Sequence, residues 1–163
     1  MGVSGAGKTT IGEALARDLG WLFLDADDYH PQENVARMAA GQALTDDERQ
    51  PWLEKLNLEL RRFDARGESA VLACSALKEC YRRRLAAGIE RLRYVYLKGD
   101  FELIRSRLAG RRHRYMPSSL LESQFSALEP PQNAIAVDVS APAPACVALI
   151  AAQLRRLPHL RGG

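Results

Sequence analysis

A glycine-rich motif lies at the start of the chain, where residues 2–9 read GVSGAGKT and match the pattern GxxxxGK(S/T). The glycines let the backbone turn so that successive N–H groups face phosphate oxygens, and a helix beginning at the lysine adds the positive end of its dipole. Lys8 is expected to reach the β- and γ-phosphates of a nucleotide, and the Thr9 hydroxyl to coordinate Mg²⁺. A chance glycine-rich turn is disfavoured because an amphipathic helix follows at once. The predicted nucleotide ligands are Gly2, Ser4, Gly5, Ala6, Gly7, Lys8, Thr9 and Thr10.

Two carboxylates, Asp25 and Asp27, follow a short apolar run over residues 21–24 that is typical of a buried strand. Ligands bind beyond the carboxyl ends of the strands in open α/β sheets, so the pair is expected beside the phosphate site. One carboxylate could hold the water shell of the metal, and the other could accept a proton from an acceptor hydroxyl. A solvated acidic turn leading into a helix cap is the alternative.

Basic residues follow in three places. Lys78 and Arg82 lie four residues apart after the apolar run at 70–74, and on one helix face they could hold an anionic substrate or the transferring phosphoryl group. An arginine-rich stretch over residues 105–114 could close over the nucleotide as a loop. The segment 49–52 (RQPW) is expected in a loop before a helix that starts at its proline, where it could face a polar ligand. The alternative for Lys78 with Arg82 and for the arginine-rich stretch is a solvated basic surface. The alternative for the tryptophan of RQPW is a position in the hydrophobic core.

An alternation of helices and strands would bring these residues together. Helical patterns cover residues 8–19, 31–40, 51–63, 77–87, 100–108, 117–128 and 143–154, and strand-like runs cover 21–24, 70–74, 94–97 and 134–139. This order predicts an α/β fold with a mainly parallel sheet. No repeat or Pro/Gly-rich linker divides the 163 residues, so one domain is expected over 1–163.

Composition excludes several classes of protein. Apolar residues make up 47% of the chain and charged residues 26%, which is typical of a globular domain rather than a disordered chain. A net charge of +3 is too balanced for a dedicated nucleic-acid binder. No apolar run approaches the ~18 residues of a membrane span. The three cysteines show no CxxC pairing, which favours a reduced cytoplasmic protein over a disulfide or zinc framework.

In combination, three motifs make the chain resemble the gluconokinases, small ATP-dependent kinases similar to shikimate kinase and the nucleoside-monophosphate kinases. These motifs are HPxxN at 30–34, DDxRxPWL at 46–53 and CSALKxxYR at 74–82, and the resemblance extends over essentially the whole chain. It implies a three-layer α/β/α fold and transfer of the γ-phosphate of ATP to the 6-hydroxyl of D-gluconate. It further implies Mg²⁺ as cofactor and a homodimer.

The resemblance also implies roles for individual residues. Asp25 would support the metal together with Thr9, and Asp27 would be the candidate base. Arg49 would bind the sugar-acid carboxylate, which suits its planar fork. Arg111 would act on the transferring phosphate and, with Arg112, bind the nucleotide from a lid over about residues 109–117. The remaining residues around the sugar acid or transferring phosphate would be His30, Asn34, Lys78 and Arg82.

The chain departs from the family pattern at two positions. Ala26 stands between the two acids, where the family commonly has Gly; this methyl is tolerable unless the backbone there needs a positive φ. His113 in the lid is displaced by one position, so no role is carried over to it. Two other functions stay open: another small-molecule kinase of this fold, acting on shikimate or a nucleotide, or a nucleotide-binding module without turnover.

One expected element has almost no residues to form it. A phosphate loop normally follows a strand of ~5–6 residues, and only Met1 precedes the motif here. In the family this strand lies centrally in the sheet, between the runs at 70–74 and 94–97. We therefore expect the chain to lack its central strand, the two runs to stand ~9–10 Å apart, and the natural protein to begin roughly ten residues upstream.

Overall fold

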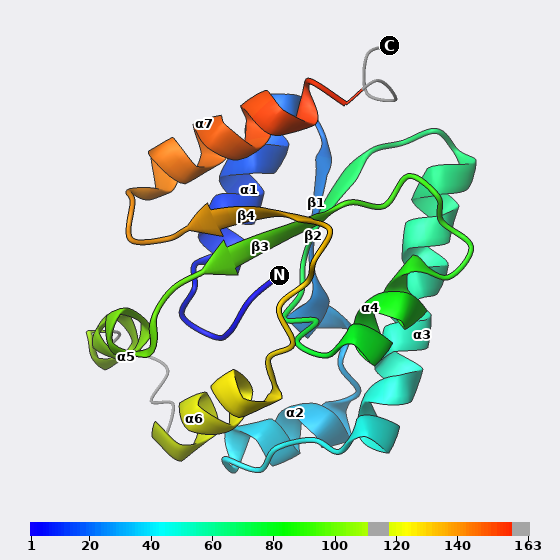
Figure 1. Cartoon of the computed structure of the whole chain (residues 1–163). Helices are drawn as coiled ribbons and strands as arrows, with labels where there is room; N and C mark the ends of the chain where they lie inside the picture. The colour runs from blue at the N-terminus through cyan, green and yellow to red at the C-terminus, as the bar shows by residue number, and fades with distance from the viewer. Residues whose placement is uncertain (111–117, 158–163) are drawn as a thin grey trace.

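The computed structural model describes residues 1–110 and 118–157 and has the α/β architecture that the sequence predicts (Figure 1). The helices are α1 (Lys8–Leu19), α2 (Gln32–Ala39), α3 (Asp46–Ala65), α4 (Glu79–Ala86), α5 (Phe101–Ala109), α6 (Ser118–Ala127) and α7 (Ala143–Leu154). The strands are β1 (Leu22–Asp25), β2 (Ala70–Ala73), β3 (Tyr94–Lys98) and β4 (Ala134–Asp138), and a short 3₁₀ helix, η1 (Ala26–Tyr29), follows β1. None of the helices in these described ranges is long and apolar enough to cross a bilayer.

The strands form two parallel pairs. β1 pairs with β2, with Leu22 opposite Ala70, and β3 pairs with β4, with Tyr94 opposite Ala134. Within each pair the two strands run in the same direction, and helices return the chain between them. The carboxyl ends of β1 and β2 lead directly into the segments that contain the predicted site residues.

Met1 links the two pairs. Its amino group donates a hydrogen bond to Val95 O at 2.5 Å, and its carbonyl accepts one from Leu97 N at 2.9 Å, which is how a parallel strand residue pairs with β3. The next residue, Gly2, donates to Ser75 O just beyond β2. A cavity of about 240 Å³ lies beside this link and is lined by residues of β2, β3 and α1. In the described part of the chain, Met1 alone stands between β2 and β3 with hydrogen bonds to a strand.

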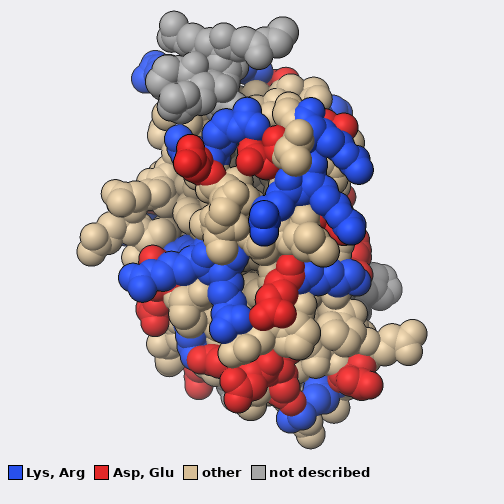
Figure 2. All heavy atoms as spheres, turned by 90° about the vertical axis from the view of Figure 1, so that its right-hand side faces the viewer, with Lys and Arg blue, Asp and Glu red and all other residues tan. Residues whose placement is uncertain are grey.

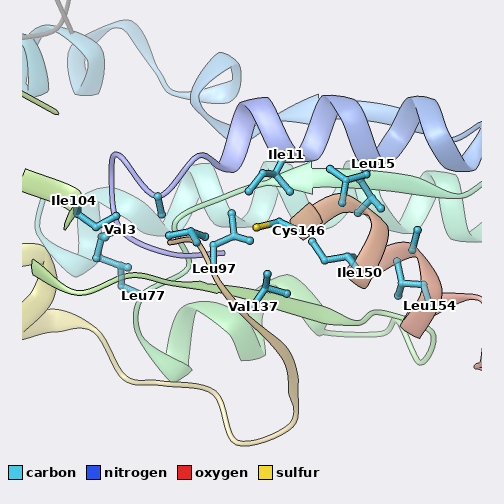
Figure 3. Close-up of a cluster of buried hydrophobic side chains, with 14 of the residues drawn as sticks. Val3, Ile11, Leu15, Leu77, Leu97, Ile104, Val137, Cys146, Ile150 and Leu154 are labelled. Carbon is cyan, nitrogen blue, oxygen red and sulfur yellow. The ribbon is translucent and has the colours of Figure 1, made fainter. Parts of the chain in front are cut away.

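The main hydrophobic core lies between α1, α7 and the strands. Ile11 and Leu15 of α1 point toward Ile150 and Leu154 of α7 in Figure 3, and Ile150 is completely buried. A second cluster packs the inner face of α3 against η1, α4 and the end of β2, and its largest members are Trp52, Leu53, Leu56, Tyr81 and Leu85. The first cluster holds the phosphate-loop helix in place, and the second holds the segments expected to carry the acceptor site.

The start of α3 differs from the prediction. Thr45 caps the helix, since its side chain accepts a hydrogen bond from Glu48 N while the Glu48 carboxylate accepts one from Thr45 N. This capping box starts α3 at Asp46, five residues before the predicted start at Pro51. The prediction that Arg49 and Trp52 lie in a loop is therefore wrong, and both are held rigidly on a helix.

Candidate active site

The phosphate loop connects Met1 to α1 with a backbone that requires glycine at both ends. Gly7 caps α1 with φ 91°, a left-handed conformation. Gly2 has φ 147°, and a Cβ there would lie 2.8 Å from the carbonyl oxygen of Leu97. Between them, Val3 and Ala6 are buried in the main hydrophobic core, and this packing fixes the loop to the core. Lys8 turns back over the loop and donates to Val3 O at 3.1 Å.

Thr9 and Asp25 meet at the mouth of this loop. The Thr9 hydroxyl donates to Asp25 Oδ2 at 2.9 Å, and the other carboxylate oxygen accepts from Asp27 N at 3.1 Å. A hydroxyl and a carboxylate are oxygen ligands of the kind Mg²⁺ prefers, and that ion usually takes its remaining ligands from water and substrate phosphates. Within residues 1–110 and 118–157, no group of three or more His, Cys, Asp or Glu side chains could hold a metal by itself. The arrangement fits a magnesium ion that binds together with a nucleotide.

Asp27 lies in η1, immediately after the Thr9–Asp25 pair, and its side chain is exposed. Ala26, at the position where a glycine was expected, is buried and has no positive φ, since Ala76 is the only non-glycine residue with positive φ in the described ranges. The methyl group at residue 26 is therefore accommodated without backbone strain. The turn presents the Asp27 carboxylate to solvent on the same side as the phosphate loop.

An aromatic stack supports the next part of the site. The rings of His30 and Trp52 lie 4.2 Å apart at an angle of 9°. The indole Nε1 of Trp52 donates to Ala26 O at 2.8 Å. The Trp52 side chain therefore contacts both η1 and His30, the residue that follows it. Asn34 is buried and donates from Nδ2 to Glu48 O at 3.0 Å, which ties α2 to α3.

A charged cluster joins α3 to the segment before α4. Lys78 Nζ donates to both carboxylate oxygens of Asp46, at 2.7 and 2.8 Å, and the Tyr81 hydroxyl donates to the same carboxylate. Hydrogen bonds from Lys78 and then from Tyr81 hold the pKa of Asp46 below its usual value. The Arg49 guanidinium lies 5.8 Å from the centre of the Tyr81 ring. Asp46 was not predicted as a site residue, although the DDxRxPWL motif contains it.

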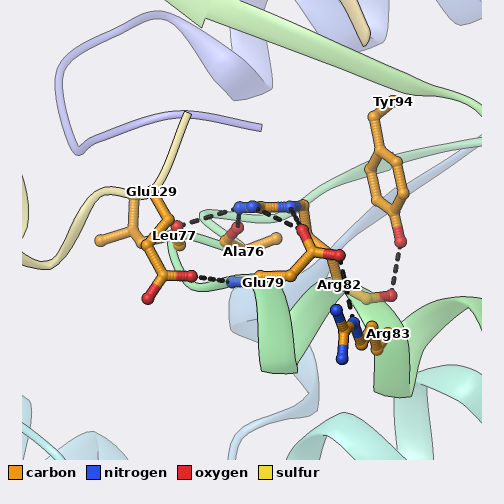
Figure 4. Close-up of polar contacts among 7 residues, drawn as sticks. All are labelled: Ala76, Leu77, Glu79, Arg82, Arg83, Tyr94 and Glu129. Atoms are coloured by element: carbon orange, nitrogen blue, oxygen red, sulfur yellow. Dashed lines mark hydrogen bonds and ion pairs between the residues drawn. The ribbon is translucent and has the colours of Figure 1, made fainter. Parts of the chain in front are cut away.

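Arg82 is buried in a network of its own (Figure 4). Its guanidinium donates to the carbonyls of Ala76 and Leu77, each at 3.0 Å, and to the carboxylate of Glu79. Glu129 reinforces the same segment, because its backbone N–H donates to Leu77 O and its carboxylate accepts from Glu79 N. Arg82 therefore shapes the loop that carries Lys78, and a contact with substrate stays a prediction for this side chain.

Helix α6, which follows the predicted lid in the sequence, also contacts the phosphate loop. Gln124 of α6 accepts a hydrogen bond from Ser4 N at 2.7 Å and donates to the Ser4 hydroxyl. The sequence motifs did not indicate this contact, although the resemblance extends over the segment SLLESQF at residues 119–125, which contains Gln124. Arg105 and Arg107 lie in α5 rather than in a loop. The predicted lid residues Arg111 and Arg112 fall outside the described residues.

Comparisons with known proteins agree with this geometry. Residues 1–131 match a family model described as an AAA domain. A probable gluconokinase of Mus musculus is 45% identical over 95% of this chain and 95% of its own length. The chain belongs to the gluconokinase family. The thermoresistant gluconokinase of Escherichia coli K12 is 39% identical over 91% of this chain and 87% of its own. The crystal structure of a gluconokinase from Sinorhizobium meliloti 1021 superposes with a TM-score of 0.86, at 41% identity, over 96% of this chain and 89% of that one.

Within this gluconokinase fold, the predicted site residues fall into two groups. The phosphate loop, Thr9, Asp25 and Asp27 are connected by the hydrogen bonds described above. The second group consists of His30, Asn34, Arg49 and Lys78, which all contact α3 or belong to it.

Figure 2 views the molecule from the right-hand side of Figure 1, and on this face basic and acidic side chains are interspersed. α3 also forms ion pairs at the surface, through Glu54 with Arg84 and through Asp64 with Arg91.

Proposed function

We propose that the chain transfers the γ-phosphoryl group of ATP to the 6-hydroxyl of D-gluconate and releases 6-phospho-D-gluconate and ADP. The observation that carries this proposal is the link between Thr9 and Asp25, which sets the phosphate loop beside the exposed carboxylate of Asp27. A metal-binding pair next to a candidate base is the arrangement that phosphoryl transfer to an alcohol requires. Membership of the gluconokinase family supports gluconate as the alcohol.

The nucleotide is held by the loop at residues 2–9. Its backbone N–H groups and the N-terminus of α1 surround the phosphates, and Lys8 neutralises the β- and γ-phosphates. Thr9 and Asp25 would hold Mg²⁺, which neutralises charge on the phosphate oxygens when it is bound. Arg111 and Arg112 complete the nucleotide site from the lid in this proposal.

Asp27 acts as the base. Its carboxylate accepts the proton of the 6-hydroxyl as that oxygen forms a bond to the γ-phosphorus, while the bond from this phosphorus to the β,γ-bridging oxygen breaks and ADP leaves. The hydrogen bond from Asp27 N to Asp25 fixes the backbone at the base, so that only the side chain needs to adjust to the acceptor.

The sugar acid lies between η1, α2 and α3. Arg49 offers a planar fork to the carboxylate, and its place on α3 fixes its direction relative to the site. His30 and Asn34 face the hydroxyl groups. Lys78 is already paired with Asp46, so its ammonium is held in position and contributes a donor without an uncompensated positive charge. Arg82 holds the loop that carries Lys78 through its hydrogen bonds to Ala76 O and Leu77 O.

A coupled assay for ADP release tests the function. Gluconate, shikimate, AMP and CMP are offered separately, with a reaction lacking any acceptor as control. We expect turnover with gluconate and none with 6-deoxygluconate, and phosphorus NMR of the product should place the new ester at carbon 6. Turnover with shikimate or a nucleotide but not with gluconate would assign the chain to another acceptor of the same fold. ATP binding without turnover of any acceptor would indicate a nucleotide-binding module.

A homodimer and a cytoplasmic location are further proposals, supported by the resemblance and by the cysteine pattern respectively. Cys74, Cys80 and Cys146 are all free thiols. Light scattering on the purified chain tests the assembly, since a dimer has twice the 18.1 kDa mass of the chain.

A further inference from the structure

We propose that Trp52 is a positioning residue that fixes His30 as a hydrogen-bond donor, through Nε2–H, to a hydroxyl group of the acceptor. This inference rests on the proposed function, because it assigns a role within the same acceptor site. It goes beyond that function by stating which ring atom acts, in which direction the hydrogen bond runs, and which side chain enforces it.

Trp52 is placed to control His30 from two directions. Its indole ring lies flat against the imidazole at 4.2 Å, which restricts tilting of the imidazole out of this plane. Its Nε1–H donates to Ala26 O, which holds the 3₁₀ turn at whose end His30 stands. Trp52 itself is only 4% exposed and is packed into the second core cluster. The imidazole is therefore held by a rigid helix, although His30 lies in an irregular segment.

The two ring nitrogens of His30 have different surroundings. Nδ1 is the one buried side-chain nitrogen or oxygen without a hydrogen-bond partner among the residues that the structure describes. A proton on Nδ1 would create a buried donor with nothing to accept it, which is less tolerable in proteins than an unused lone pair. The proton of the neutral ring therefore belongs on Nε2, which is not among the buried side-chain atoms without a partner in the described residues.

The charge state of the ring points the same way. Burial lowers the pKa of His30, and nearby Arg49 lowers it further, whereas Asp27 raises it. Burial is the largest of these effects, so the imidazole is neutral at neutral pH. A neutral ring with its proton on Nε2 can donate to a hydroxyl oxygen but cannot accept the hydroxyl proton through that atom. This division leaves proton acceptance to Asp27.

Long-range ¹H–¹⁵N NMR of the full chain without substrate tests the tautomer directly. We expect the spectrum of His30, assigned by its loss in His30→Gln, to show the neutral Nε2–H form at pH 7.5. The Nδ1–H form, or a protonated ring at that pH, would overturn the inference. In Trp52→Leu the same resonances should show a mixture of tautomers, because the ring is no longer held, whereas Trp52→Phe retains a stacking partner.

Steady-state kinetics test the donor role. His30→Ala should raise KM for gluconate about tenfold with KM for ATP unchanged, as expected for the loss of one hydrogen bond. His30→Gln, whose amide can donate from nearly the same place, should recover most of the loss. Trp52→Leu should raise the same KM, with a smaller effect in Trp52→Phe. Equal effects on both KM values, or no rescue by Gln, would contradict a donor role. Absence of gluconate turnover in the parent chain would overturn the proposed function and the donor role together, whereas turnover with the Nδ1–H tautomer would overturn only this inference.

Discussion

The Thr9 hydroxyl and the Asp25 carboxylate are 2.9 Å apart, although they belong to different elements. Thr9 lies in the first turn of α1, and Asp25 is the last residue of β1. Their hydrogen bond aligns the helix that begins at the phosphate loop with the strand that leads to the candidate base. Two oxygen ligands suited to Mg²⁺ are thus brought together.

Asp25→Asn should raise the Mg²⁺ concentration needed for turnover more than it raises the KM for ATP measured at saturating Mg²⁺. The amide retains an oxygen but loses the negative charge, so we expect the Mg²⁺ concentration for half-maximal turnover to rise by at least about tenfold. Titration of Mg²⁺ at fixed ATP and gluconate measures this. An unchanged Mg²⁺ requirement would show that Asp25 does not support the metal.

Asp27→Asn should remove most turnover with little change in the Mg²⁺ requirement, because the amide cannot accept the hydroxyl proton. The expected loss in kcat is about 10²- to 10⁴-fold, the usual contribution of a general base. Asp28→Asn is the matched control, since Asp28 is exposed in the same 3₁₀ turn and takes no part in the proposed site. Near-parental kcat in Asp27→Asn would assign the base elsewhere.

Arg82→Met should destabilise the fold by about 2–4 kcal/mol, because two buried carbonyls lose their donor along with the ion pair to Glu79. Arg83→Met tests the specificity of this effect. Arg83 also pairs with Glu79, but its side chain is 79% exposed, and we expect a change within about 0.5 kcal/mol. Urea unfolding of both variants gives the comparison, and equal stabilities would contradict a structural role for Arg82.

In the 163-residue chain, the buried amino group of Met1 should make stability depend on pH. Burial, and then Lys8, lower the pKa of this group from 8.0 to about 5 in the folded state. Between these values the unfolded chain binds a proton that the folded chain does not, so the free energy of unfolding should rise as pH increases from 5 to 8 and change little above that. Acetylation of the amino group removes the titration but keeps an N–H donor for Val95. The difference in slope between acetylated and free chains, measured by urea unfolding, isolates this group from His30; identical slopes would contradict the prediction.

Local signals explain what the sequence could predict of the fold. α1 spans the expected residues 8–19, because Gly7 and Gly20 mark its two ends, and both have left-handed φ values. α7 likewise covers residues 143–154, as predicted. The start of α3 differs from the prediction because the Thr45–Glu48 capping box, rather than Pro51, begins the helix. The short turn η1 was missed because four residues are too few to show a hydrophobic period.

Contacts between distant segments account for the rest of the site. The motifs predicted which segments would meet, but they contain no information on which atoms meet. Ser4 and Gln124 are 120 residues apart in sequence, and their hydrogen bond depends on how α6 packs. The same holds for Lys78. The sequence predicts that its ammonium group binds an anionic substrate, and the structure shows that this group is also paired with the carboxylate of Asp46. Side-chain partners of this kind are set by tertiary packing rather than by local spacing.

The position of α1 has a consequence for how the molecule opens. This helix packs against β1 and β2 on one side and against α7 on the other, while Met1 supplies hydrogen bonds to β3 and Gly2 one to the end of β2. In the 163-residue chain, the elements predicted to bind the triphosphate thus also provide hydrogen bonds that link the two pairs of strands. Bound nucleotide is therefore expected to slow amide exchange in β2 and β3 together in this chain.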